Sequence, residues 1–226
     1  MLKILYQDPA IVVCEKPFRV LSTDEPGGMP DCIRQALGRP EAEVRTVHRL
    51  DQVVGGLMVY ALTPQAASDL SRQIREDRFL KEYLAVIHWR PREEEGTFLD
   101  LLGRNPKTRK TYVAKLPGKG IQQAVLHYRV VDSRQGFSLV SIRLETGRTH
   151  QIRVHFASIG HPLAGDDLYG GSRERIARQA LHCAKQSFAV PVYTPLPDGI
   201  RVEMPLQLRT VTVESPLPPD MEALFS

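Results

Sequence analysis

Residues 57–89, LMVYALTPQAASDLSRQIREDRFLKEYLAVIHW, decide the fold class because they place a helix between two apolar strands. Residues 57–62 are a near-continuous apolar run, which is typical of a buried strand. Thr63-Pro64 then supplies an N-cap and a first-turn proline for a helix that we expect to end near residue 77. Residues 81–89 are largely apolar on both faces, which predicts a central strand.

Further elements are predicted on both sides by hydrophobic periodicity and turn residues. Towards the N-terminus we expect two short strands, a turn-rich loop and a helix, at residues 3–6, 10–14, 22–28 and 29–37. Towards the C-terminus we expect a hairpin of two strands at residues 121–131 and 138–144, followed by a helix at 149–159 that is capped by Thr149. A small helical connector at 173–179 and two strands at 180–190 and 200–204 complete the predicted elements. Because strands and helices do not alternate strictly, an α+β fold is favoured over a doubly wound sheet.

The composition is that of an ordinary globular protein. Hydrophobic residues make up 42% and charged residues 25% of the 226 residues, which is compatible with a single domain over residues 1–226. No apolar run approaches the ~20 residues that span a bilayer, and the N-terminus lacks a secretory signal. We therefore expect a cytoplasmic protein with no membrane contact. Cys14, Cys32 and Cys183 are widely spaced and indicate neither a disulfide framework nor a zinc site.

The net charge of +4 is unevenly distributed along the chain. Residues 101–131 contain no Asp or Glu but several cationic side chains, namely Arg104, Lys107, Arg109, Lys110, Lys115, Lys119 and Arg129. Such a stripe suits a polyanion. A solvated hairpin face would have the same composition, so both interpretations stay open on the sequence.

The first dense polar stretch is Val47-His48-Arg49-Leu50-Asp51, which precedes Gly55-Gly56. It places a carboxylate, with a histidine and an arginine beside it, on a loop between two extended segments. Taken alone, the stretch is better explained as a turn in which Asp51 caps backbone N–H groups.

Two more polar stretches follow. Residues 146–155, TGRTHQIRVH, lead a glycine turn into a helix, and a helix N-terminus with two arginines attracts anions such as phosphate or carboxylate. A capped surface helix would explain this stretch equally well. Residues 161–170, HPLAGDDLYG, form a loop stiffened by proline and glycine.

In this order, the three stretches resemble the RluA-like family of RNA pseudouridine synthases. HRLD alone would be a weak match, but its combination with the other motifs at family-like separations is strongly specific. The resemblance runs from about Ile11 to Met204. The segments that carry it are Glu15-Lys16-Pro17, HRLD at 48–51, Gly56-Leu57, KEY at 81–83, GRTHQIRVH at 147–155 and HPLAGD at 161–166.

This resemblance implies a fold, a reaction and a set of residue roles. The fold would be the family's α+β catalytic fold, a mixed and mainly antiparallel sheet flanked by helices and loops, with an active-site cleft across the sheet. The reaction would isomerise specific uridines in rRNA or tRNA without a cofactor or a metal. Asp51 would be the nucleophile, Tyr83 the active-site tyrosine and Arg153 the partner of the aspartate. The expected substrate-binding residues are His48, Arg49, Arg148, His150, Gln151 and Leu163, the last as an apolar wall beside the uracil.

The chemistry explains why such residues are needed. The bond from ribose C1′ to uracil N1 breaks and the base rejoins through C5, so nothing is added or lost. An ionised carboxylate can attack the sugar or stabilise it as a cation, and a nearby arginine favours that ionised form when the site is buried. A uridine in folded RNA must also be flipped out, and cationic contacts to phosphates offset that cost. Tyr83 would stack on the base or assist the loss of the C5 proton, and which group accepts this proton stays open.

The sequence departs from the family pattern at two places. Gln52-Val53-Val54-Gly55-Gly56 stands where a polar pair and Thr-Ser-Gly are common, and Arg19 stands where a glycine commonly follows Lys-Pro. These departures affect the shape of the loop and the choice of target rather than Asp51 itself. The chain also begins almost at the catalytic core, without room for an S4-type RNA-binding module, so we expect the core of a monomer to recognise the RNA.

Two other functions would use some of the same residues. One is a catalytically inactive RNA-binding chaperone on the same fold, against which the retention of Asp51, Tyr83 and Arg153 argues. The other is a metal-dependent phosphoesterase. Its ligands would be His150, His155, His161, Asp166 and Asp167, but these residues contain no HxxxH or HxH pair.

Overall fold

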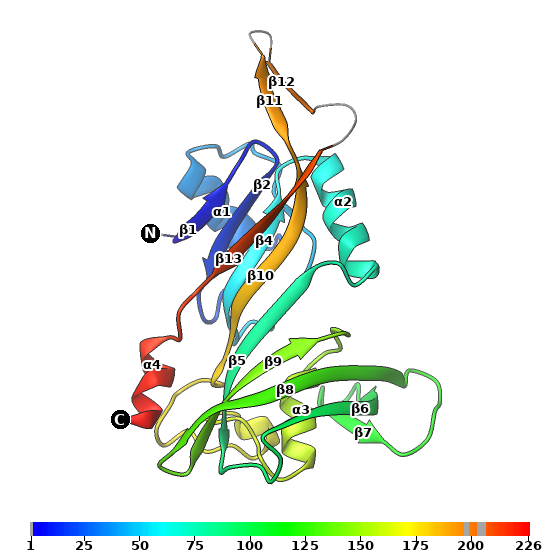
Figure 1. Cartoon of the computed structure of the whole chain (residues 1–226), viewed down its shortest axis with the longest axis vertical. Helices are drawn as coiled ribbons and strands as arrows, with labels where there is room; N and C mark the ends of the chain where they lie inside the picture. Colours follow the sequence, from blue (N-terminus) through cyan, green and yellow to red (C-terminus); the bar gives the residue numbers. More distant parts are fainter. Residues whose placement is uncertain (1, 197–198, 203–206) are drawn as a thin grey trace.

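The computed structural model describes residues 2–196, 199–202 and 207–226, and most of its strands join one twisted sheet (Figure 1). The strands are β1 (Ile4–Gln7), β2 (Ile11–Lys16), β3 (Arg45–Thr46), β4 (Gly55–Ala61), β5 (Leu80–His88), β6 (Glu95–Arg104), β7 (Thr111–Ala114), β8 (Gln122–Arg134), β9 (Phe137–Leu144), β10 (Leu181–Pro191), β11 (Tyr193–Leu196), β12 (Gly199–Val202) and β13 (Leu208–Glu214). The helices are α1 (Met29–Leu37), α2 (Pro64–Arg75), α3 (Gln151–Ser158) and α4 (Pro219–Glu222), with 3-10 turns at η1 (Asp167–Tyr169) and η2 (Ala223–Phe225). Within the described ranges no helix has the length and apolarity that a membrane crossing requires.

The large sheet has eleven strands in the order β1-β2-β4-β10-β5-β9-β8-β6-β7, with β13 beside β10 and β3 beside β4. The pair of β4 and β10 is parallel, and the other strand pairs among the described residues are antiparallel. A separate hairpin consists of β11 and β12. The fold is therefore α+β with a mixed, mainly antiparallel sheet, as the sequence indicates.

Residues 57–89 form the predicted strand, helix and strand. β4 is buried along its whole length. The Thr63 hydroxyl accepts a hydrogen bond from the Ala66 N–H at 3.2 Å, so Thr63 is the N-cap of α2, which ends at Arg75 rather than near residue 77. β5 lies inside the sheet between β10 and β9, which confirms the prediction of a central strand.

β5 also joins the two halves of the molecule. In Figure 1 the upper half contains β1, β2, β4, β10 and β13 with α1 and α2, and the lower half contains β6, β7, β8 and β9 with α3. One hydrophobic core runs through both halves, since it includes Val59 of β4, Ile142 of β9 and Phe156 of α3. The strands that flank β5 therefore bring segments from both halves to one place.

The start of α3 differs from the prediction. Thr149 is not the N-cap. That position is held by His150, whose φ of 56° is left-handed, and its side chain makes no capping hydrogen bond. The turn is instead held by the side chain of Gln151, whose Oε1 accepts hydrogen bonds from the Arg148 N–H at 2.9 Å and from the Thr146 hydroxyl at 2.8 Å. At the other end of the helix Ile159 is exposed.

The predicted helical connector at residues 173–179 is also wrong, because this segment contains no helix. Arg178 anchors it in an irregular path, since its guanidinium forms two 2.7 Å hydrogen bonds to Asp220 and donates to the carbonyls of Gln179 and Leu181. The strand expected at residues 200–204 is partly confirmed by β12, and residues 203 and 204 lie outside the described residues.

Candidate active site

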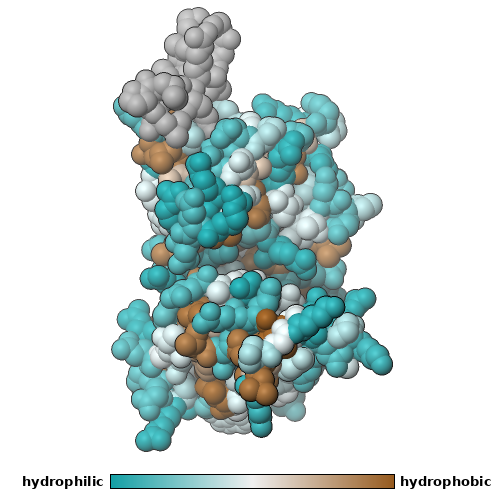
Figure 2. Space-filling model, turned by 90° about the vertical axis from the view of Figure 1, so that its right-hand side faces the viewer, coloured by the Kyte–Doolittle hydropathy of each residue, from teal (hydrophilic) through white to brown (hydrophobic). Residues whose placement is uncertain are grey.

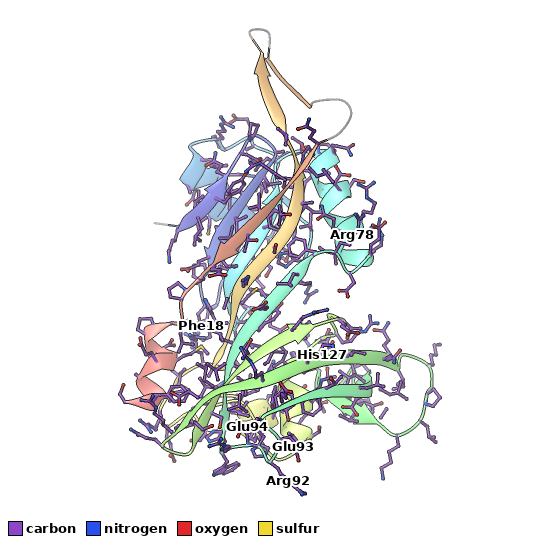
Figure 3. All side chains as sticks on the ribbon, viewed as in Figure 1. Phe18, Arg78, Arg92, Glu93, Glu94 and His127 are labelled. Atoms are coloured by element: carbon purple, nitrogen blue, oxygen red, sulfur yellow. The ribbon has the colours of Figure 1, made fainter. Side chains whose placement is uncertain are left out.

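A cavity of about 340 Å³ opens between the two halves of the molecule. Seen from the side, the surface is hollowed at mid-height (Figure 2). One wall comes from the segment between α2 and β5, where Arg78 is labelled in Figure 3. Another wall comes from the end of β9, which pairs with β8, the strand on which His127 is labelled in the same figure. The lining includes residues 47–51, Tyr83 and residues 144–148 and 150–153. The fold therefore brings the first two polar stretches of the sequence to one cavity.

Asp51 lies on the loop between β3 and β4, with its side chain 25% exposed to the cavity. Its Oδ2 is 3.6 Å from Arg153 Nη1 and 3.7 Å from His150 Nε2. Both separations are too long for hydrogen bonds, but the charge of Arg153 at 3.6 Å attracts the carboxylate. Among the described residues its carboxylate accepts no backbone N–H. The carboxylate thus does not cap a turn and is open to the cavity.

The loop that carries Asp51 is fixed on both sides. On one side Ser22 both donates to the Leu50 carbonyl at 2.8 Å and accepts from the Leu50 N–H at 3.1 Å. On the other side the ammonium of Lys16 donates to the Gln52 carbonyl at 3.1 Å and to two carbonyls of residues 17–20. Lys16 is 1% exposed, and this burial lowers its pKa to about 8, although the charge of Asp51 opposes the shift. The sequence signalled Lys16 only as part of Glu15-Lys16-Pro17.

Arg153 is buried on the first turns of α3 and contacts two carboxylates, the predicted Asp51 and, more closely, Asp166. Its Nε and Nη2 donate to the two carboxylate oxygens of Asp166 at 2.6 and 2.7 Å, whereas Asp51 is contacted only by Nη1 at 3.6 Å. Burial acts to lower the pKa of Arg153, but the hydrogen bonds and the charge of Asp166 outweigh it and raise that pKa. Asp166 thus fixes a permanent cation beside Asp51, a role that sequence reasoning missed.

Tyr83 and His48 are both neutral groups beside the cavity. Burial raises the pKa of Tyr83 well above its usual value of 10, with Cys183 and Asp51 adding to the effect. Burial likewise lowers the pKa of His48 to about 3. The Nε2 atom of His48 accepts a hydrogen bond from the Val59 N–H at 3.4 Å, so this histidine joins its loop to β4.

Arg49, Arg148 and Gln151 also line the cavity, in different ways. Arg49 is exposed, so its charge is available to a ligand. Arg148 is partly exposed and donates from Nε to the Gln123 carbonyl at 3.0 Å. Gln151 is 3% exposed, and its amide bonds the Thr146 hydroxyl, the Arg148 N–H and the carbonyl of Val125, so Gln151 clamps the turn. This structural role comes in addition to its place in the cavity lining, where substrate binding stays a prediction.

Leu163 is not part of the cavity lining, so its predicted place beside the base is wrong. Its side chain is fully buried in the core, and its backbone forms a bridge with Ile87 at the end of β5. Hydrogen bonds from the His88 N–H to the Pro162 carbonyl and from the Ala164 N–H to the Val86 carbonyl hold the loop there. The apolar lining comes instead from Leu50, Val54, Ile74, Phe79, Ile152 and Leu181.

The residues weighed as metal ligands are dispersed. His155 is fully buried and stacks on Phe98 at 5.0 Å, while Asp166 is engaged with Arg153. In the described part of the chain no group of three His, Cys, Asp or Glu side chains is arranged to hold a metal ion.

Comparisons with known proteins agree on one family. The family model described as RNA pseudouridylate synthase matches residues 10–158. The chain is 34% identical over 231 residues to the uncharacterized RNA pseudouridine synthase YhcT of Bacillus subtilis, covering 99% of this chain and 71% of that relative. It is 34% identical over 239 residues to the ribosomal large subunit pseudouridine synthase D of Nitrosomonas europaea, covering 99% of this chain and 64% of that relative.

A solved structure of a protein from the same family also matches this chain. The human RNA pseudouridylate synthase domain containing 1 matches with a TM-score of 0.78 and 25% sequence identity, over 100% of this chain and 88% of that one. Sequence and structure thus agree along nearly the whole length of the chain. This chain belongs to the RNA pseudouridine synthase family and is an isomerase that acts on RNA.

Proposed function

We propose that the chain converts uridine to pseudouridine in structured RNA with Asp51 as its nucleophile. The observation that carries this proposal is the position of Asp51, which opens to the cavity with Arg153 and His150 each less than 4 Å from its Oδ2. A carboxylate that faces a buried cation at the edge of a cavity is suited to attack a sugar carbon.

The reaction follows from the groups around the cavity. The Asp51 carboxylate engages ribose C1′ as the bond to uracil N1 breaks, and the bonding electrons leave with the base. The base turns within the apolar lining, and C5 bonds to C1′ as the carboxylate leaves. The proton on C5 then departs and N1, which kept the electrons of the broken bond, gains one, so the product has the same composition as uridine. Tyr83 lies in the wall as a neutral phenol, which suits contact with the uracil ring or a part in that proton transfer.

RNA binding is assigned to a cationic surface at the end of β6 and on the loop that follows it. Four cations are exposed there, Arg104 at the end of β6 and Lys107, Arg109 and Lys110 on the loop between β6 and β7, and within the described residues none of the four forms an ion pair. Tyr112 of β7 is also exposed beside them. Phosphate contacts from such cations offset the few kcal/mol that flipping a nucleotide costs. Arg49, exposed at the cavity, is suited to contact the nucleotides on either side of the flipped uridine.

Large-subunit ribosomal RNA is the first substrate to test. The support is the relative from Nitrosomonas europaea, which is named a ribosomal large subunit pseudouridine synthase and aligns with 99% of this chain. Transfer RNA is the second substrate class. The proposal treats the chain as one catalytic domain, because one hydrophobic core joins both halves of the molecule.

The test is an assay of Asp51→Asn with unmodified large-subunit RNA and transfer RNA, followed by mapping of pseudouridine. We expect wild type to form pseudouridine at discrete positions, with or without a chelator, and Asp51→Asn to form none while it binds RNA normally. Asp69→Asn is the matched control, because Asp69 is a carboxylate on α2 that contacts Arg72 at 2.9 Å and the Gln65 side chain at 3.0 Å, both on the same helix and away from the cavity lining. Normal turnover by Asp51→Asn would overturn the role of Asp51. Tight RNA binding by wild type without modification under single-turnover conditions would instead favour a chaperone.

A further inference from the structure

Tyr169 joins the turn η1 to two segments that lie far apart in the sequence, the start of β7 and the start of α3. It belongs to the turn η1 and is 8% exposed. Its hydroxyl oxygen lies 2.9 Å from the Thr111 N–H nitrogen and 3.2 Å from the Thr111 carbonyl at the start of β7. The same oxygen lies 3.0 Å from His150 Nδ1, and the Arg153 guanidinium carbon lies 5.0 Å from the ring centre. Tyr169 therefore touches two of the groups closest to Asp51.

The hydrogen count at this hydroxyl restricts how the groups bond. A phenol has one proton to donate, while its oxygen accepts up to two hydrogen bonds. The Thr111 N–H supplies one of the accepted bonds at 2.9 Å. The single proton then points either to the Thr111 carbonyl at 3.2 Å or to His150 Nδ1 at 3.0 Å.

The two arrangements differ in what His150 presents to Asp51. If Tyr169 donates to Thr111, then Nδ1 must carry the imidazole proton, and a bare Nε2 lone pair faces the Asp51 carboxylate oxygen at 3.7 Å. That contact is repulsive. If Tyr169 donates to Nδ1, then Nε2 carries the proton and its N–H dipole points at the carboxylate. The second arrangement is attractive and uses the shorter of the two contacts.

His150 is suited to this tautomer choice because it is a neutral group. Burial is the largest cause that lowers its pKa, and the charge of Arg153 lowers it further, while Asp51 and Asp166 oppose the shift. The backbone of His150 is left-handed at φ 56°, a conformation that costs energy for a residue other than glycine. The fold thus places this side chain between Tyr169 and Asp51 at an energetic cost.

We propose that Tyr169 is a positioning residue that fixes His150 as the Nε2–H tautomer and so holds an N–H towards Asp51. The inference deepens the proposed function, on which the role of Asp51 rests. In this arrangement Arg153 Nη1 and His150 Nε2–H approach the same oxygen of Asp51, and the carboxylate is oriented before the nucleotide arrives.

The tautomer is measurable without RNA. In 15N-labelled wild-type protein, long-range 1H–15N NMR spectra of the imidazole groups distinguish a protonated from an unprotonated ring nitrogen. His150→Asn assigns the His150 signals. We expect His150 Nε2 to be protonated and Nδ1 to be unprotonated in wild type, and Tyr169→Phe to shift the population towards the Nδ1–H form. A wild-type spectrum with protonated Nδ1, or a Tyr169→Phe spectrum with unchanged His150 signals, would overturn the proposal.

Turnover supplies the second readout. Tyr169→Phe removes one hydroxyl, and we expect kcat to fall about tenfold with KM for RNA nearly unchanged. The matched control is Tyr6→Phe, which removes a hydroxyl that donates to Asp8 at 2.8 Å on the edge strand β1. The double variant Tyr169→Phe/His150→Asn should be no slower than His150→Asn, because the two residues act through one contact. If the kcat losses of the two single variants added up in the double variant, the proposal would be contradicted. If wild-type protein were inactive, the proposed function would be contradicted, and the NMR spectra alone would decide the tautomer of His150.

Discussion

Asp166 binds Arg153 through a two-pronged contact of 2.6 and 2.7 Å in which both side chains are buried. Two parallel bonds fix the plane of a guanidinium, so they also fix the direction of its third nitrogen. That nitrogen, Nη1, lies 3.6 Å from Asp51. The orientation of the cation beside the proposed nucleophile is therefore set by a residue that lies on the other side of the arginine.

Asp166→Asn should reduce both stability and turnover. The substitution keeps the shape but replaces one accepting oxygen by an NH2 group that repels the guanidinium, which leaves a buried charge poorly compensated. Breaking a buried ion pair on one side costs about 3–5 kcal/mol of unfolding free energy. Equilibrium unfolding in urea and a single-turnover assay measure the two effects.

Asp220→Asn is the matched control for this prediction. Arg178 and Asp220 form the same two-pronged contact at 2.7 Å, but the Asp220 side chain is 47% exposed. Water compensates an exposed partner, so we expect a loss of about 1 kcal/mol or less and normal turnover. Equal losses of stability in the two variants, or full activity of Asp166→Asn, would contradict this account.

Most of the fold was predictable because its signals are local. The apolar run of β4, the Thr63 cap of α2 and the two apolar faces of β5 depend on neighbouring residues only. The start of α3 was not predictable in this way. There the side chain of Gln151 reaches back to the turn and to β8, so the cap at Thr149 expected from local sequence does not form.

The candidate site was predictable where motifs carry it and not where tertiary contacts do. Asp51, Tyr83 and Arg153 all reach the cavity or its edge as the family resemblance implies. The pairing of Arg153 with Asp166 and the contact of Tyr169 with Thr111 join residues whose approach depends on how the loop after α3 packs. Leu163 was misplaced for the same reason, since the backbone of that loop bonds to β5 and turns the side chain into the core.

The cations between β6 and β7 should contribute through phosphate contacts. We expect Lys107→Ala and Lys110→Ala each to weaken RNA binding and to reduce the slope of log affinity against log salt concentration by about 0.7 to 1 per lost contact. Lys185→Ala is the control, because Lys185 pairs with Glu214 at 2.7 Å on β10 and its loss should leave the slope unchanged. Affinities measured across a range of salt concentrations decide the question. Equal slopes in all the variants would contradict the assignment of this surface.

Gly56→Ala should destabilise the protein strongly. Gly56 has a φ of 117°, and an added Cβ would lie 2.4 Å from the backbone nitrogen of Cys183, across the parallel contact of β4 and β10. Neither strand can move without breaking that pairing, so we expect a loss on the order of 3 kcal/mol or more of unfolding free energy.

Gly147→Ala is the control for stability, since an added Cβ there meets nothing within 4 Å. It should unfold within about 0.5 kcal/mol of wild type. If Gly56→Ala and Gly147→Ala had the same urea midpoint, the close approach of β4 to β10 would not require a glycine at residue 56.

His155→Phe should remove part of the acid sensitivity of the fold. His155 is fully buried against Phe98, and neither of its ring nitrogens has a hydrogen-bond partner among the described residues. Burial lowers its pKa to about 4 from an ordinary 6.5, although the nearby charge of Asp100 opposes the shift. Between these two pH values His155 is protonated in the unfolded chain but stays neutral in the folded protein. This histidine therefore lowers the free energy of unfolding as the pH falls from 6.5 to 4, by up to about 3 kcal/mol.

Phenylalanine keeps the ring and removes the proton uptake. At pH 7 the variant should be as stable as wild type or more stable, because two unsatisfied polar atoms are lost. Urea unfolding of both proteins at intervals from pH 7 to pH 4 measures the difference in unfolding free energy between them. Burial also lowers the pKa values of His48 and His182, but both proteins contain these histidines, so their contributions cancel in the difference. The gap in unfolding free energy should widen as the pH falls. Parallel pH profiles would mean that His155 is protonated as readily in the folded protein as in the unfolded chain.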